Sequence, residues 1–232
     1  MADYKLFRLS ATLVLIGGAL VTVVALFLHP GGAPTEEGVL ANFAASSDWV
    51  AIHLGQFVGM AVLLAGLLVL FFALGETSGT PRWLGFFGAL AAGVALVLAA
   101  LEFAVDGVAN KQAAVAWVSA PAAEKAARFA SAEALRWLEW GTVSYLNFLL
   151  GLALVLFALV IVWTARVPRL IGSLMGVSGL AFIVAGWVIG TMGFRGIQIV
   201  PTDAAYTLLS ASMIWQLIVA WPRKASVQAA PG

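Results

Sequence analysis

The sequence has no cysteine, and only 10% of its 232 residues are charged. Without cysteine, the chain can form no disulfide, no thiolate metal site and no iron–sulfur cluster from its own residues. A soluble domain usually has about 25% charged residues, so the low charge argues against that class. The formal net charge of +1 argues against a polyanionic partner, and no nucleic-acid-binding motif is present. We therefore expect no nucleic-acid partner.

Apolar residues are abundant instead: they make up 62% of the chain and gather in six long stretches. These stretches cover residues 9–28, 49–74, 83–105, 140–164, 169–193 and 204–221. Each is close to, or longer than, the roughly 20 residues that cross the hydrocarbon of a bilayer. In lipid a segment must satisfy its own backbone hydrogen bonds, which a helix does. The sequence therefore predicts an all-α, polytopic integral membrane protein with six transmembrane helices in one bundle, a single domain over residues 1–232.

The first stretch follows Lys5 and Arg8, as the core of a signal peptide would. It is longer than the usual core of about 7–15 residues, and no A-x-A cleavage site closes it. We expect it to be a retained span. With six spans, both termini and the short loops 76–82 and 165–169 lie on one side. Most basic residues lie on that side: Lys5, Arg8, Arg82, Arg166, Arg169, Arg223 and Lys224. The positive-inside rule then predicts cytoplasmic termini in a multi-pass protein of the cell (plasma, or inner) membrane.

The connection between the third and fourth spans, residues 106–138, is predicted to be a partly helical outer segment. Its second half, "SAPAAEKAARFASAEALRW", is rich in alanine, glutamate, lysine and arginine, which are good helix formers. Pro121 suits the first turn of a helix. The fourth span is therefore expected to be the lower part of one long helix that stands partly outside the bilayer.

Ionisable residues near membrane depth are costly, and they are candidates for function. Five of them collect at the expected outer ends of the spans: His29, His53, Glu102, Asp106 and Glu139. At 100° per residue, Glu102, Asp106 and Asn110 form one row of a helix that can face the histidines. Two imidazoles and two or three carboxylates suit zinc, manganese or non-haem iron, so we name His53, Glu102, Asp106 and His29 as candidate metal ligands.

Other interpretations of these residues stay open. The carboxylates can serve as acid–base partners of histidine, or simply cap a solvated vestibule. A haem held by His29 and His53 is the weaker cofactor alternative. Two further residues join His53, Glu102, Asp106 and Glu139 as ligand-binding candidates. Arg195 can neutralise a carboxylate, and Gln216 needs a polar partner inside the bundle.

Three classes of function compete at this point. The first is a membrane protein with a metal- or small-ligand-binding pocket at its outer face. The second is a non-catalytic accessory or sensor subunit of a membrane complex, and the third is a small transporter. The lipid bilayer is the expected surrounding, and a membrane-protein partner or a second copy of the chain is a further candidate. No enzymatic reaction and no catalytic residue is assigned by the sequence.

Overall fold

The computed structural model describes residues 3–29, 32–76, 78–194 and 196–221, and within these ranges it contains helices and no strand. The helices are α1 (Tyr4–Phe27), α2 (Glu36–Ala45), α3 (Trp49–Leu74), α4 (Gly79–Ala104), the π-helix η1 (Val105–Asn110), α5 (Lys111–Val118), α6 (Lys125–Thr164), α7 (Arg169–Met192) and α8 (Ile199–Ala220). The all-α fold class is thereby confirmed.

Within the described part of the chain, six helical segments are long and apolar enough to cross a membrane, as predicted. They are α1, α3, the continuous segment Gly79–Val118, α6, α7 and α8. Gly79–Val118 and α6 have 40 residues each, so each is about 60 Å long at 1.5 Å per residue. Both therefore extend well beyond about 30 Å of hydrocarbon, and the parts that extend form the helical segment that was expected between the third and fourth spans.

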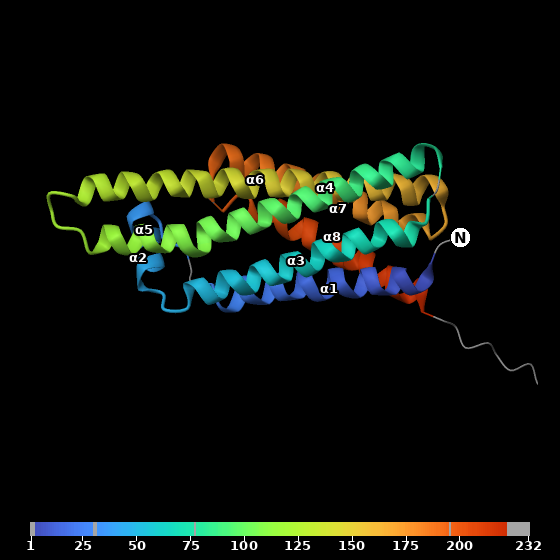
Figure 1. The fold of residues 1–232 in the computed structure, drawn as a ribbon, viewed down its shortest axis with the longest axis horizontal. Coiled ribbons are helices and arrows are strands. Elements are labelled where there is room, and N and C mark those ends of the chain that lie inside the picture. The colour runs from blue at the N-terminus through green and yellow to red at the C-terminus, as the bar shows by residue number, and fades with distance from the viewer. Residues whose placement is uncertain (1–2, 30–31, 77, 195, 222–232) are drawn as a thin grey trace, which may run out of the picture.

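The six long segments lie side by side along the bundle (Figure 1), and their contacts close a ring in chain order. Helix α1 packs against α3, α3 against α4, α4 against α6, α6 against α7, α7 against α8, and α8 returns to α1. One end of the ring carries α2, α5 and the beginning of α6, at the left of Figure 1. We call this the α2–α5 end. The opposite end holds the beginning of α1, where the Asp3 side chain accepts hydrogen bonds from the backbone of Lys5 and Leu6.

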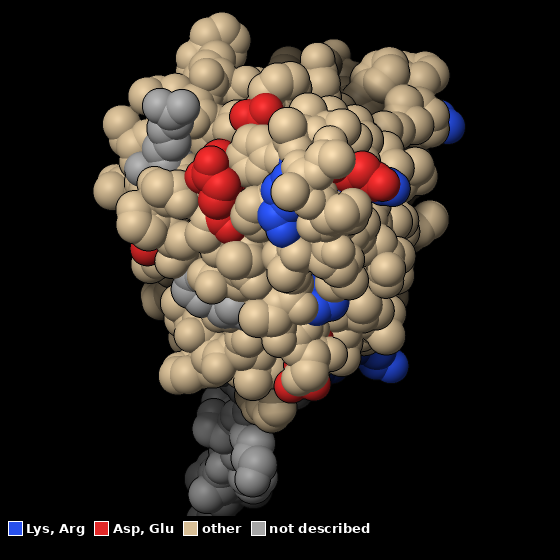
Figure 2. Space-filling view, turned by 90° about the vertical axis from the view of Figure 1, so that its left-hand side faces the viewer, with Lys and Arg blue, Asp and Glu red and all other residues tan. Residues whose placement is uncertain are grey.

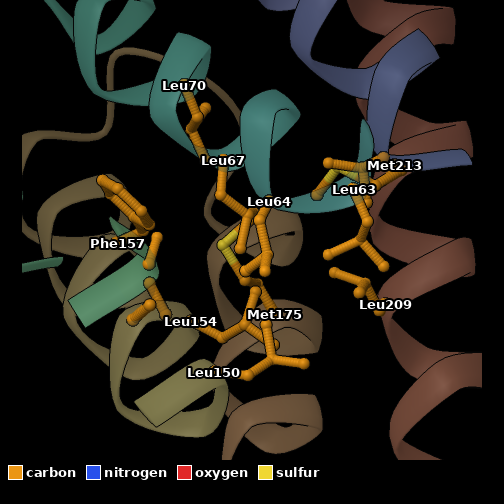
Figure 3. Packing of buried hydrophobic residues seen from close by; sticks show 14 of the residues in the cluster. Leu63, Leu64, Leu67, Leu70, Leu150, Leu154, Phe157, Met175, Leu209 and Met213 are labelled. Carbon is orange, nitrogen blue, oxygen red and sulfur yellow. The ribbon is translucent and has the colours of Figure 1, made fainter. Parts of the chain in front are cut away.

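The interior of the ring is filled by large aliphatic and aromatic side chains over much of its length. Figure 3 shows leucines of α3 and α6 in contact with Phe157, Met175 and Met213. Glycines bring the helices together around this core. A Cβ atom on Gly66 of α3 would lie 2.9 Å from the Ser10 carbonyl oxygen of α1, and one on Gly179 of α7 would lie 2.6 Å from the Gly151 carbonyl oxygen of α6. Small residues allow this close approach of helices in lipid.

A separate, smaller apolar cluster closes the α2–α5 end. Its buried members are Leu40, Phe43, Trp49, Ala114 and Ala132. Lysine 111 ties α2 to this cluster, because its Nζ donates hydrogen bonds to the carbonyl oxygens of Phe43, Ala44 and Ser46. Figure 2 looks onto this end and shows acidic and basic side chains interspersed on a mostly uncharged surface. The cap formed by α2, α5 and α6 lies directly over the candidate site.

Candidate functional site

The site begins at the first turns of α3, where Trp49 and His53 are both almost fully buried. Residues four apart lie on the same face of a helix, and here the two rings lie 4.3 Å apart, centroid to centroid. His53 Nδ1 lies 2.7 Å from the Trp49 carbonyl oxygen. A carbonyl oxygen only accepts hydrogen bonds, so Nδ1 carries the hydrogen and donates it. In the neutral ring, Nε2 is then the nitrogen with a lone pair.

The opposite wall is the π-helix η1, which interrupts the segment α4–α5. Short π-helices are rare and often occur at functional sites. Its Asp106 backbone carbonyl accepts a hydrogen bond of 2.8 Å from Trp49 Nε1. The next residue is Gly107, and a Cβ atom there would lie 2.6 Å from the His53 Cβ. The lack of a side chain at Gly107 therefore allows α3 and η1 to approach until His53 and Asp106 meet.

His53 Nε2 lies 2.8 Å from Asp106 Oδ2. With Nδ1 donating to Trp49, both of these facing atoms are acceptors unless a proton or another cation lies between them. His29, from the chain just after α1, is the third member: its ring lies 5.3 Å from that of His53 and 5.0 Å from that of Trp49. One potential ligand atom from each of His29, His53 and Asp106 lies within 4.8 Å of the others. We call these three residues the His–His–Asp cluster.

A second polar network adjoins the cluster on the α6 side. Asn110 Nδ2 donates to Asp106 Oδ1 at 3.3 Å and also to Glu139 Oε2. Arg136, three residues before Glu139, donates to the same Glu139 oxygen and lies 3.8 Å from Glu36 of α2. The Arg136, Glu139 and Asn110 side chains are buried. Buried charges are stable when paired and hydrogen-bonded, and this network both meets that need and fixes the orientation of Asp106.

Two neighbouring cavities open beside these residues. The larger, of about 420 Å³, is lined by His29, Glu102, Asp106, Arg136 and Glu139 together with apolar residues of α1, α2 and α6. We call it the polar cavity. The smaller, of about 280 Å³, lies deeper and reaches Met60, Leu146 and Tyr206; we call it the inner cavity. Both are lined by Glu102, Phe103, Val143 and Phe194, so Glu102 lies where the two cavities meet.

The structure therefore brings together five of the predicted site residues. His29, His53 and Asp106 form the cluster, and Glu102 and Glu139 line the polar cavity beside it. Glu102 is not a member of the cluster, although it was a candidate metal ligand. Gln216 lies at the other end of the bundle, where its Nε2 donates to the Phe7 carbonyl oxygen at 2.8 Å. Arg195 lies outside the described residues.

Some residues of the site were not anticipated from the sequence. Arg136 was missed, although its position three residues before Glu139 on a helix is a known spacing for an ion pair. The role of the Trp49 indole and the capping of α2 by Lys111 were also missed. Both depend on contacts between residues more than fifty positions apart, for which a single sequence gives no signal.

The ring geometry bears on the choice between a metal ion and a haem. The two imidazoles meet edge to face, with their planes at 66°, and Trp49 packs against both. Axial ligands of a haem lie on opposite faces of a porphyrin, which would have to fill the space where the rings of His29 and His53 now meet. A single ion at the shared edge of the cluster requires a much smaller change. The geometry of the cluster therefore favours a metal ion over a haem.

The chain matches no protein family, and comparison with curated proteins and with solved structures finds no similar chain either.

Proposed function

We propose that this chain is an integral membrane protein that binds a divalent transition-metal ion through His29, His53 and Asp106. The observation that carries the proposal is the contact between His53 Nε2 and Asp106 Oδ2 at 2.8 Å, two atoms that need a cation or proton between them. A metal-binding histidine usually donates its other ring N–H to a carbonyl or carboxylate. His53 does so through Nδ1 to Trp49.

The spacing of the cluster supports an ion of this class. Ligand atoms at about 2.1 Å from a tetrahedral ion lie about 3.4 Å from one another. The atoms of the cluster are separated by 2.8 Å at the His53–Asp106 contact and by no more than 4.8 Å overall. Small rotations of the His29 side chain and of the carboxylate are sufficient to reach that geometry. Two histidines and one carboxylate suit zinc, manganese or iron(II).

Three protein ligands leave at least one coordination position for water or a small ligand. His29 and Asp106 line the polar cavity, so the open position of a bound ion would face that space. Asn110 and the Arg136–Glu139 pair are then outer residues that orient Asp106, as the second shell of a metal site does. The arrangement fits an ion that binds or activates a small molecule better than one that only stabilises the fold.

We further propose that the protein lies in the plasma membrane with its termini in the cytoplasm, so that the α2–α5 end and the metal site face outward. The support is the concentration of lysine and arginine at the opposite end, including Lys5, Arg8, Arg82, Arg166 and Arg169. A metal ion would then reach the site from the outer aqueous phase.

Metal analysis of the purified protein tests the proposed site. We expect one Zn²⁺, Mn²⁺ or Fe²⁺ per chain after equilibration with the ion, and an affinity reduced at least tenfold in His53→Ala and in His29→Gln. The second variant is included because His29 is partly exposed and its substitution leaves the hydrogen bond between His53 and Trp49 in place. Asp106→Asn removes the charged ligand, and its matched control is Asp48→Asn, an exposed acid beside the cluster.

Metal affinity equal to that of the parent in folded His29→Gln and Asp106→Asn proteins would refute the proposal. So would a parent protein that takes up none of the three ions. Folding of each variant is checked by size-exclusion chromatography and far-UV circular dichroism.

A further inference from the structure

The inner cavity holds a set of buried polar atoms that the proposed metal site does not use. Its walls are mainly apolar side chains from all six long segments, among them Val21, Met60, Leu146 and Ile189. Polar side chains also line it, from Glu102 of α4, from Asn147 of α6 and from Gln198, Thr202 and Asp203 at the beginning of α8. The cavity thus combines a mostly apolar wall with a few polar groups, as small-molecule sites commonly do.

Three oxygen atoms of residues that line this cavity lack a hydrogen-bond partner among the described residues. They are Glu102 Oε2, Gln198 Oε1 and Thr202 Oγ1, and each atom is buried from solvent. The Glu102 side chain belongs to a residue with only 5% of its surface exposed. Buried polar atoms are nearly always paired, so three unpaired oxygens around one cavity indicate a missing partner.

The chemistry of these atoms identifies the missing partner as a hydrogen-bond donor. The oxygens of an ionised carboxylate and of an amide only accept hydrogen bonds, and a hydroxyl oxygen can accept as well. A primary ammonium group has three N–H donors, one for each unpaired oxygen. Asp203 also lines the cavity and adds a second carboxylate, which favours a positively charged ligand over a neutral one.

The size of the cavity limits the rest of the ligand. A cavity of about 150 Å³ lined by apolar side chains can hold benzene. The inner cavity, at about 280 Å³, therefore accommodates a molecule of roughly ten non-hydrogen atoms by the same proportion. The aromatic rings of Phe103, Phe194 and Tyr206 line it together with the aliphatic side chains, so an apolar body the size of one ring fits the space beyond the ammonium group.

From these observations we infer a second binding site, distinct from the His–His–Asp cluster: the inner cavity binds a small primary amine with an apolar body. The ammonium group donates to Glu102, Gln198 and Thr202, and the apolar body packs toward Met60 and Leu146. Because Glu102 also lines the polar cavity, such a ligand can enter from the α2–α5 end past this carboxylate.

Isothermal titration calorimetry on the purified full-length protein in detergent tests the inference, with 2-phenylethylamine as the probe. Its neutral analogue, 2-phenylethanol, has the same number of non-hydrogen atoms and no charge. We expect saturable binding of the amine, and binding of the alcohol at least tenfold weaker. Glu102→Gln should weaken amine binding at least tenfold, and Thr202→Val, which keeps the side-chain volume, should weaken it less. Glu133→Gln, the same substitution on α6 outside both cavities, should leave it unchanged.

The outcomes are decisive in each direction. Equal binding of amine and alcohol, or amine binding that Glu102→Gln and Thr202→Val both leave unchanged, overturns the inference. An absence of amine binding at millimolar concentration also overturns it and indicates that ordered water satisfies the three oxygens. The metal proposal is separable, because His29→Gln should lose metal affinity and keep amine binding, whereas Glu102→Gln should do the reverse.

Discussion

Replacement of Lys111 by methionine should release α2 from the α2–α5 end while the six-helix ring stays folded. Lys111 Nζ donates to the carbonyl oxygens of Phe43, Ala44 and Ser46 at 2.9, 2.8 and 2.7 Å. The last carbonyls of a helix have no partner within it, and here a cation supplies one, also interacting favourably with the helix dipole. Methionine retains most of the side-chain stem and removes all three donors.

The magnitude follows from the partial burial of these contacts. A hydrogen bond to a charged group contributes about 1.5–3 kcal/mol, but water can reach carbonyls that lose a part-buried partner. We therefore expect Lys111→Met to lower the free energy of opening α2 by about 2 kcal/mol, well below the sum for three separate hydrogen bonds. Because about 1.4 kcal/mol corresponds to a factor of ten, the opening of α2 should become roughly thirtyfold more frequent.

Hydrogen exchange with mass spectrometry measures this opening directly. Peptides covering α2 should exchange about thirtyfold faster in Lys111→Met, while peptides from α3 and α7 keep the parent's protection. Lys125→Met is the matched control, since Lys125 Nζ donates to one carbonyl oxygen, that of Val118. Unchanged exchange in α2 would show that the three hydrogen bonds do not hold it. A uniform increase over the whole chain would show that Lys111 stabilises the bundle rather than the cap.

Two further predictions concern the site and its orientation. Gly107→Ala should separate η1 from α3, because the added Cβ would lie 2.6 Å from the His53 Cβ; we expect a destabilisation of about 1–3 kcal/mol and weaker metal binding. Thermal unfolding and metal titration check this, with Gly141→Ala, where a Cβ meets no atom within 4 Å, as the control, and parent-like metal affinity in Gly107→Ala would contradict it. The absence of cysteine allows a simple test of orientation: a membrane-impermeant maleimide should label Ala123→Cys in intact cells and Ser78→Cys only after lysis. The reverse pattern would place the His–His–Asp cluster on the cytoplasmic side.

The architecture was largely predictable because a bilayer imposes strict requirements on length and polarity. The apolar stretch expected at 49–74 has the same bounds as α3. The stretch expected at 9–28 begins later than α1, which starts at Tyr4 because Asp3 caps its first turn. Helix α2 was not anticipated, since its ten residues are too short and too mixed in polarity for a periodic signal. Short helices of this kind are stabilised by tertiary contacts such as those of Lys111.

The sequence predicted at which ends of the spans the candidate site lies, but not how its residues contact one another. The scarcity of ionisable residues made His29, His53, Glu102, Asp106 and Glu139 conspicuous, and the helical row from Glu102 through Asp106 correctly indicated a shared wall. The pattern did not show the partition of these residues among the His–His–Asp cluster, the ion pair with Arg136 and the inner cavity. Asp106 meets His53, Glu139 pairs with Arg136, and Glu102 faces the inner cavity. That partition depends on how far neighbouring helices rotate and approach, which Gly107 and η1 determine.

The wide turn of η1 affects the direction in which side chains point along the helical segment that contains it. Glu102, Asp106, Asn110 and Ala114 follow one another at intervals of four, and all are buried. In an uninterrupted α-helix each such interval drifts by about 40°, so three of them turn a side chain about 120° away from its starting direction. A turn with i→i+5 bonds takes more than four residues, and its drift runs the opposite way. One irregular turn thus opposes the drift of the flanking α-helical turns and keeps these four side chains in the interior of the bundle, from the inner cavity to the cap.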